Sequence, residues 1–141
     1  MPIRKAQAEW NGDLATGKGS LKTETGSFNG QYSFTSRFEE GTGTNPEELI
    51  AAAHAGCYSM ALSAGLAKAG FKPISVKTAD EVVLEKTEAG FTITKIIVHC
   101  EAQVEGLDNE KFQQFAEDTK AGCPVSRALA GTTFELHAKL V

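Results

Sequence analysis

A chain of 141 residues, 41% of them hydrophobic, is long enough to form one domain with a buried core, and we expect a single domain over residues 1–141. Its 14 basic and 18 acidic residues are dispersed and give a net charge of −4, which argues against binding to nucleic acid or to anionic lipid. The first residues lack the apolar run of a signal peptide, and no membrane span is expected, so we predict a soluble cytoplasmic protein. In that compartment three cysteines are expected to be thiols, metal ligands or transient redox pairs rather than a structural disulfide framework.

The N-terminal third is predicted to be antiparallel β-structure. Mixed segments at residues 3–10, 19–23 and 32–38 are separated by stretches rich in Gly, Asn and Asp, which supply the backbone angles of tight turns. We therefore expect three strands before residue 39.

A long helix is predicted from Asn45 to about Gly70. Pro46 suits a first helical turn, Glu47 and Glu48 lie near the positive end of the helix dipole, and Gly70 is a stop signal. Residues 49–66 are nearly all small or apolar, so the helix has no polar face and is expected to be buried on most sides.

The second half is predicted to contain a hairpin, two helices and a last strand. The hairpin joins residues 74–86 to 91–104, and apolar side chains recur at every second position of its second strand. A helix from Asp108 to about Ala121 is followed by a break, a short second helix and a strand over 132–141. This order indicates an α+β domain whose sheet layers pack on the central apolar helix.

Two cysteines stand in the predicted helices, Cys57 in the long one and Cys123 in the later one, 66 positions apart. A thiol is a strong nucleophile only as the thiolate, and its ordinary pKa of about 8.5 leaves little ionised at neutral pH. Cys57 lies some three turns beyond Pro46, outside the useful field of the helix terminus, so a positive side chain must be brought to it. Arg37 is the nearest candidate in the sequence, although it is one of 14 basic residues and, from the residues alone, a surface ion pair is the favoured interpretation.

Other polar residues near Cys57 have two interpretations each. His54 is one helical turn before Cys57 and could act as a base, but a packed, hydrogen-bonded histidine is favoured. Glu47 and Glu48 could serve only the helix dipole, and composition does not separate them. The scattered cysteines lack the spacing of a zinc site, so no metal is expected, and Cys100 is predicted to be a small buried hydrophobic residue.

Several motifs closely resemble the OsmC/Ohr family along essentially the whole chain. They are Ala8-Glu-Trp-Asn-Gly12, Arg37-Phe-Glu39, Gly43-Thr-Asn-Pro-Glu-Glu-Leu49, Ala52-Ala-His-Ala-Gly-Cys57 and Ala121-Gly-Cys-Pro-Val-Ser126, and they look like the OsmC branch rather than the Ohr branch. The resemblance implies an intertwined homodimer in which antiparallel sheets wrap around two long central helices. It also implies a stress-response peroxidase that reduces organic hydroperoxides, and hydrogen peroxide less well, without a bound cofactor.

The resemblance also assigns roles to four residues. It implies that Cys57 is the peroxidatic cysteine, Cys123 the resolving cysteine, Arg37 the partner of the thiolate and Glu47 the carboxylate that orients the arginine. The resulting Cys57–Cys123 disulfide would be reduced by an external dithiol, for which a lipoyl-type dithiol is one candidate. Glu47 and Cys57 are ten residues apart on one predicted helix, roughly 15 Å along its axis. If Glu47 orients the arginine beside a Cys57, we therefore expect it to come from the partner subunit.

Two functions of other classes stay open at this point. A redox sensor or a small-ligand binding module could use the same disulfide as a switch, but it would be oxidised once instead of turning over. A structural or nucleic-acid-binding module is disfavoured by the acidic balance of the chain.

Overall fold

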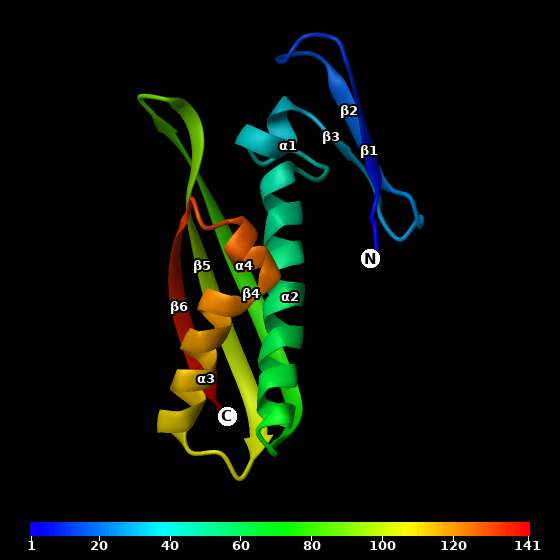
Figure 1. The fold of residues 1–141 in the computed structure, drawn as a ribbon. Coiled ribbons are helices and arrows are strands. Elements are labelled where there is room, and N and C mark those ends of the chain that lie inside the picture. The colour runs from blue at the N-terminus through cyan, green and yellow to red at the C-terminus, as the bar shows by residue number, and fades with distance from the viewer. The chain divides into compact units, whose positions relative to one another are not determined.

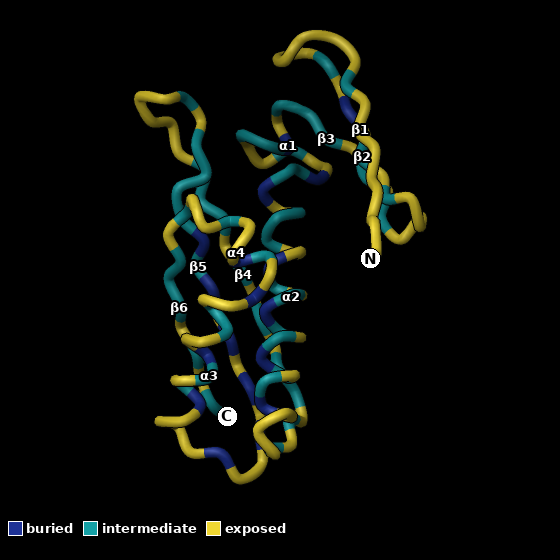
Figure 2. Tube along the Cα trace, viewed as in Figure 1, coloured by how far each residue is buried: buried dark blue, intermediate teal, exposed yellow.

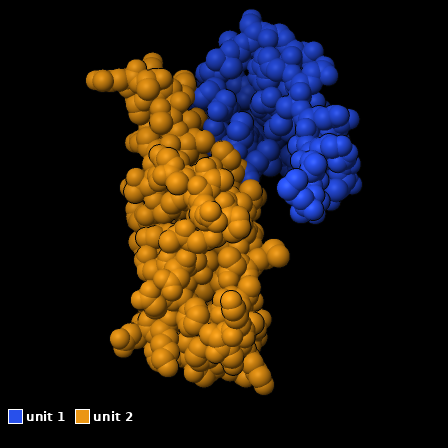
Figure 3. All heavy atoms as spheres, viewed as in Figure 1, with its two compact units in different colours: residues 1–49 blue, residues 50–141 orange.

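The computed structural model describes all residues from 1 to 141 and divides into two compact units, residues 1–49 and residues 50–141 (Figure 3). Each unit contains its own three-stranded sheet. The long helix α2 (Pro46–Lys68) begins at the end of the first unit and continues into the second.

The first unit is built on an antiparallel sheet, as predicted. Its strands are β1 (Ala6–Asn11), β2 (Lys18–Thr23) and β3 (Asn29–Tyr32), in that order. Trp10 and Tyr32 flank Gly19 of β2, and their ring centroids are 5.3 Å apart. A Cβ atom at Gly19 would lie 2.4 Å from the Tyr32 ring and 2.7 Å from the Trp10 ring, so only glycine lets the two rings meet over the middle strand.

The strand predicted over residues 32–38 is wrong, because β3 ends at Tyr32 and a short helix, α1 (Phe34–Phe38), follows it. Ser33 and Ser36 cause the change by forming a capping box. The Ser33 hydroxyl accepts from the Ser36 N–H at 3.3 Å, and the Ser36 hydroxyl accepts from the Ser33 N–H at 2.8 Å. These local bonds close a helical turn and place Arg37 in the last turn of α1.

The second unit packs helices on one face of a mixed sheet (Figure 1). Strands β4 (Lys72–Thr87) and β5 (Gly90–Glu105) form the predicted hairpin, and β6 (Thr133–Leu140) lies parallel to β5. The parallel pairing follows from the crossover through α3 (Asn109–Gly122) and α4 (Pro124–Ala128) between these two strands.

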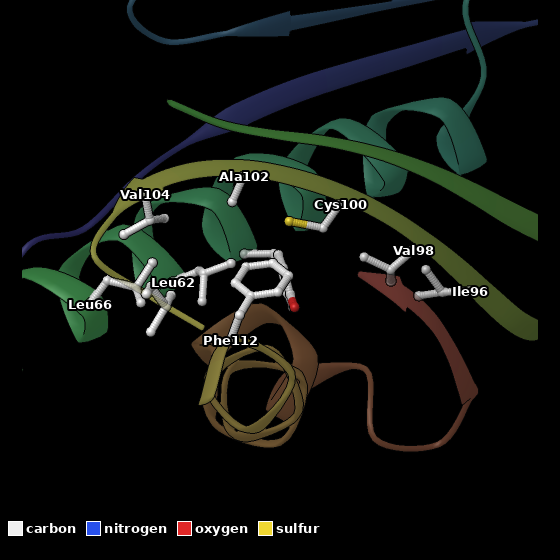
Figure 4. Close-up of a cluster of buried hydrophobic side chains, with 10 residues drawn as sticks. Leu62, Leu66, Ile96, Val98, Cys100, Ala102, Val104 and Phe112 are labelled. Atoms are coloured by element: carbon white, nitrogen blue, oxygen red, sulfur yellow. The ribbon is translucent and has the colours of Figure 1, made fainter. Parts of the chain in front are cut away.

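The core of this unit lies between β5, α2 and α3, whose buried side chains converge in Figure 4. The β5 members alternate along the strand and are Ile96, Val98, Cys100, Ala102 and Val104. They meet Leu62 and Leu66 from α2 and Phe112 from α3. The apolar residues that recur at every second position in the sequence therefore form the core-facing side of β5.

Helix α2 is buried along one stripe only, so the expectation of burial on most sides is wrong for the single chain (Figure 2). The buried stripe recurs every four residues and consists of His54, Tyr58, Leu62 and Leu66. The opposite face is exposed and made mostly of small residues; its members are Ala53, Gly56, Met60, Ala64 and Ala67. Helix α2 has almost no amphipathic pattern because this exposed face carries no charged side chain.

Helix α2 is also long and apolar enough to cross a membrane, contrary to the expectation that no segment approaches such a span. Length and composition alone are weak evidence, because a core helix passes the same test. One face of α2 packs against the core of the second unit through Tyr58, Leu62 and Leu66.

Cys123 lies between α3 and α4. Its expected position inside a helix is therefore wrong, whereas the expected break after about Ala121 is confirmed. Its N–H donates to the Thr119 carbonyl of α3 at 2.9 Å, and its carbonyl accepts from the Arg127 N–H of α4 at 3.0 Å. Pro124 has no N–H and begins α4 at its first position. The cysteine therefore occupies the corner at which the chain changes direction.

Candidate active site

The second unit brings the two singled-out cysteines into contact. Cys57 projects from the middle of α2 and Cys123 from the α3–α4 corner, and their Sγ atoms share a hydrogen bond at 2.7 Å. Both are free thiols; Cys57 is partly exposed, whereas Cys123 is 1% exposed. The fold thus joins two thiols that are 66 residues apart in the chain.

The surroundings act in opposite directions on the two thiols. Burial, followed by the hydrogen bond with Cys123, raises the pKa of Cys57, and only the Val125 backbone opposes this. Burial also disfavours ionisation of Cys123, but Cys57 and the polar groups of Ser126 and Val125 outweigh it and lower the pKa of Cys123. The second unit therefore supplies no cation that would hold Cys57 as the thiolate.

The first unit joins Arg37 and Glu47. Arg37 Nη2 donates to Glu47 Oε1 at 2.8 Å, and Arg37 Nε lies 3.2 and 3.3 Å from the two carboxylate oxygens. The Glu47 side chain is 9% exposed and that of Arg37 is 35% exposed, so the carboxylate is buried behind a guanidinium that faces outward. Such a two-point contact fixes the plane of the guanidinium as well as its position.

The structure separates Glu47 from Glu48, which composition could not do. Asn45 caps α2 by accepting from the Glu48 N–H at 2.7 Å, and the Glu48 carboxylate accepts from the Thr44 hydroxyl at 2.8 Å. Glu48 therefore serves the start of the helix, whereas Glu47 binds the arginine.

A cavity of about 420 Å³ lies beside Arg37 within the first unit. Aromatic and apolar side chains dominate its lining, which consists of Trp10, Gly12, Leu14, Tyr32, Ser33, Phe34, Arg37 and Phe38. The guanidinium carbon lies 5.3 Å from the centre of the Phe38 ring. The cavity therefore offers apolar walls and one positive group.

His54 is fully buried and hydrogen-bonded, which confirms the favoured interpretation of this residue. Its Nδ1 atom contacts Asp80 of β4, and its Nε2 atom lies 2.7 Å from the Ser126 hydroxyl of α4. The ring also packs against Phe134, with 5.0 Å between the ring centroids.

Sequence reasoning missed Asp80 and Ser126. A usable signal existed for Asp80, because it pairs with Val98 on the core-facing side of the hairpin, where a carboxylate is out of place without a partner. Ser126 carried no comparable signal, since a serine in a short helix is common.

Cys100 is 1% exposed, and burial raises its pKa, so it is a packing residue as predicted. No group of three or more His, Cys, Asp or Glu side chains that could hold a metal ion occurs in the structure.

Comparison with known proteins agrees with this fold. The model of the OsmC-like protein family matches residues 39–137. The chain is 53% identical over 127 residues to peroxiredoxin OsmC of Escherichia coli (strain K12), a match that covers 89% of each protein. An organic hydroperoxide resistance protein of Xanthomonas axonopodis pv. citri is 34% identical over 92 residues, which are 64% of this chain and 63% of that protein.

Among solved structures, an organic hydroperoxide resistance protein OsmC from Legionella pneumophila superposes with a TM-score of 0.72. The superposition covers 99% of both chains at 25% sequence identity. The predicted α+β, OsmC-like fold is confirmed, and the chain belongs to the OsmC family.

Proposed function

We propose that this protein is a thiol-dependent peroxidase that reduces organic hydroperoxides, and hydrogen peroxide less well. The observation that carries the proposal is the 2.7 Å contact between Cys57 and Cys123, two free thiols brought together by the fold. The names of two relatives, a peroxiredoxin and an organic hydroperoxide resistance protein, support the same chemistry.

Cys57 is the thiol that attacks the peroxide, since it is partly exposed whereas Cys123 is buried. Its thiolate attacks the terminal oxygen, the O–O bond breaks, and the products are a Cys57 sulfenic acid and an alkoxide that takes up a proton to become the alcohol.

Cys123 then resolves the sulfenic acid. Its sulfur attacks Cys57 Sγ, the S–O bond breaks, and a Cys57–Cys123 disulfide and water are formed. An external dithiol, of which a lipoyl-type dithiol is one candidate, reduces the disulfide by exchange and restores both thiols. The cycle uses no metal or prosthetic group.

Arg37 supplies the positive charge that Cys57 lacks in its own unit, and Glu47 orients the guanidinium. Burial raises the Cys57 pKa, so a thiolate at neutral pH needs a cation, and a guanidinium suits a thiolate and a departing oxygen equally. Glu47 lies ten residues before Cys57 on α2, roughly 15 Å away along the axis, and Arg37 is bound to Glu47 of its own chain. We therefore assign the pair to Cys57 of the partner subunit in a homodimer.

The exposed face of α2 supports such a dimer. Gly56 and the alanines of this face permit close approach of a second helix, and Met60, at 76% exposure, would gain a buried contact. In this arrangement residues 1–141 form one domain that is completed by its partner. The cavity beside Arg37 would receive the organic group of the hydroperoxide.

Sustained turnover tests the proposal. The reduced protein is mixed with cumene hydroperoxide and excess dihydrolipoamide, and peroxide consumption is followed; many equivalents per protein are expected. Thioredoxin and glutathione serve as comparison reductants. Consumption of a single equivalent of peroxide would identify a redox sensor instead.

We also propose a cytoplasmic location, because thiols stay reduced in that compartment.

Replacing Cys57 is expected to have the largest effect of any single change. Cys57→Ser removes the nucleophile, so peroxide consumption should fall to the rate of the buffer, whereas Cys100→Ser, which changes a thiol outside the site, should remain active. Ordinary turnover by Cys57→Ser would refute the assignment.

A further inference from the structure

A buried chain of three polar side chains lies behind the cysteine pair, and the steps described so far do not use it. Asp80 contacts His54 Nδ1, and His54 Nε2 lies 2.7 Å from Ser126 Oγ. The side chains of His54 and Asp80 are fully buried, and Ser126 is 3% exposed. With Asp80 accepting from Nδ1–H, Nε2 is left as an acceptor for the serine hydroxyl, the arrangement in which histidine acts as a base.

This chain of side chains leads to the resolving cysteine. Ser126 follows Cys123 by three residues, so the two buried residues lie on the same face of the turn that begins α4. The hydroxyl and backbone N–H of Ser126 lower the pKa of the Cys123 thiol, whereas burial raises it. His54 in turn precedes Cys57 by one turn of α2. The order of groups is therefore Asp80, His54, Ser126, Cys123 and Cys57, all within the second unit.

We propose that His54, oriented by Asp80, accepts the proton of Cys123 through the Ser126 hydroxyl when Cys123 attacks the Cys57 sulfenic acid. This inference rests on the proposed peroxidase function and adds a base to its second step. Ser126 relays the proton, and Asp80 positions the imidazole and stabilises its charged form.

The step balances without an added oxidant or reductant. As the Cys123 S–H proton moves to Ser126 Oγ, the Ser126 proton moves to His54 Nε2, and the sulfur forms the S–S bond with Cys57. The S–O bond of the sulfenic acid breaks at the same time. The departing hydroxide is protonated by the return of the proton from His54 through Ser126, so one thiol and one sulfenic acid become one disulfide and one water.

One observation argues that the chain is more than a packing feature. Asp80 Oδ1 is buried without a hydrogen-bond partner, and an unsatisfied carboxylate oxygen in a core is destabilising. The one reactive group toward which the chain leads is Cys123.

The other titratable groups around this chain are Tyr58 on α2, Cys100 on β5, Glu117 on α3, whose charge acts on Tyr58, and Arg127 on α4. Burial is the main cause that raises the pKa values of Tyr58 on α2 and Cys100 on β5, and the charge of Asp80 adds to both. Phe134 of β6 covers the imidazole ring, and Arg127 of α4 is exposed. The proton acceptor within the relay is therefore His54.

Single-turnover measurements on Ser126→Ala test the relay. Reduced full-length protein is mixed with one equivalent of cumene hydroperoxide between pH 6 and 9.5, and samples are quenched with dimedone or acid and weighed intact. We expect sulfenic acid to form at the wild-type rate. Disulfide formation should slow by up to about 30-fold at pH 7, because an unaided thiol of pKa about 8.5 is only a few per cent ionised there.

The pH profile separates a relay from a structural role. The deficit of Ser126→Ala should close as the pH rises past about 9, where Cys123 ionises unaided, and Ser126→Thr should restore the neutral rate. Asp80→Asn should show the same deficit, and Ser59→Ala, which removes an α2 hydroxyl bonded to Thr78 at 2.7 Å, should not. A deficit of equal size at every pH, or none at pH 7, would overturn the relay.

The wild-type protein provides a test that needs no variant to fold. With the relay, disulfide formation keeps its rate as the pH falls from 8.5 toward 7; a tenfold loss for each pH unit over that range would contradict it. If wild type forms neither sulfenic acid nor disulfide, the peroxidase proposal itself fails. If both form normally while Ser126→Ala resolves at the wild-type rate at pH 7, only the relay fails.

Discussion

In the proposed mechanism, the two units of this protein carry complementary halves of one chemistry. Residues 1–49 hold a guanidinium fixed by a buried carboxylate beside an apolar cavity, but they contain no cysteine. Residues 50–141 hold the thiol pair and a buried polar relay, but burial there raises the pKa of Cys57. Each half lacks what the other supplies. Because Glu47 and Cys57 are ten residues apart on α2, we expect the two halves of one active site to come from different subunits.

The halves also differ in how the chain builds them. Arg37 and Glu47 are ten residues apart, and the capping box of α1 and the Asn45 cap of α2 that orient them are local. The contacts of the second unit join residues 26, 66 and 72 positions apart. The charged site of the first unit is therefore assembled locally, whereas the buried site of the second unit needs the complete sheet and its helices.

Removing the resolving thiol should stop turnover but, unlike Cys57→Ser, leave the first reaction with peroxide intact. Cys123→Ser should still form one sulfenic acid at Cys57 but should lose the turnover that depends on the Cys57–Cys123 disulfide, because no second thiol captures the intermediate. Intact-mass analysis under excess cumene hydroperoxide should show the dioxidised sulfinic form. Continued disulfide formation in this variant would mean that Cys100 or another chain resolves Cys57.

Loosening the Arg37 guanidinium in the first unit should reduce peroxidase activity less than the loss of either cysteine. Glu47→Gln removes the charge that fixes Arg37, so we expect kcat/KM for cumene hydroperoxide to fall about tenfold, roughly 1.4 kcal/mol of transition-state stabilisation. Glu48→Gln is the matched control, because Glu48 bonds to Thr44 and should change kcat/KM less than about twofold. Equal losses in the two variants would remove the special role of Glu47.

The regular elements of both units were predictable from local patterns. Helix α2 follows from its start and stop signals, Pro46 and Gly70, and the core face of β5 follows from alternating apolar residues. Residues 33–38 were misassigned because two serine side chains close a helical turn where a strand was expected. The break and the short second helix predicted after about Ala121 are confirmed, and Cys123 lies in that break, directly before Pro124 opens α4.

The candidate site was predictable only where motifs are local. The sequence and the family resemblance singled out Cys57, Cys123, Arg37 and Glu47, and the structure joins them as two separate pairs. For the relay, the sequence marked only Asp80, as a carboxylate at a core-facing position of its strand. That Asp80 and Ser126 both reach His54 was not predictable, because long-range packing brings them together.

The sharing of one active site by two subunits is tested most directly by mixing two inactive variants. Arg37→Ala lacks the cation and Cys57→Ser lacks the nucleophile. After joint unfolding and refolding, half of the dimers should be mixed, and each should contain one site with Arg37 from one subunit and Cys57 from the other. We predict that peroxidase activity returns to about a quarter of the wild-type value, with unmixed variants as controls. A mixture as inactive as its parents would contradict the account.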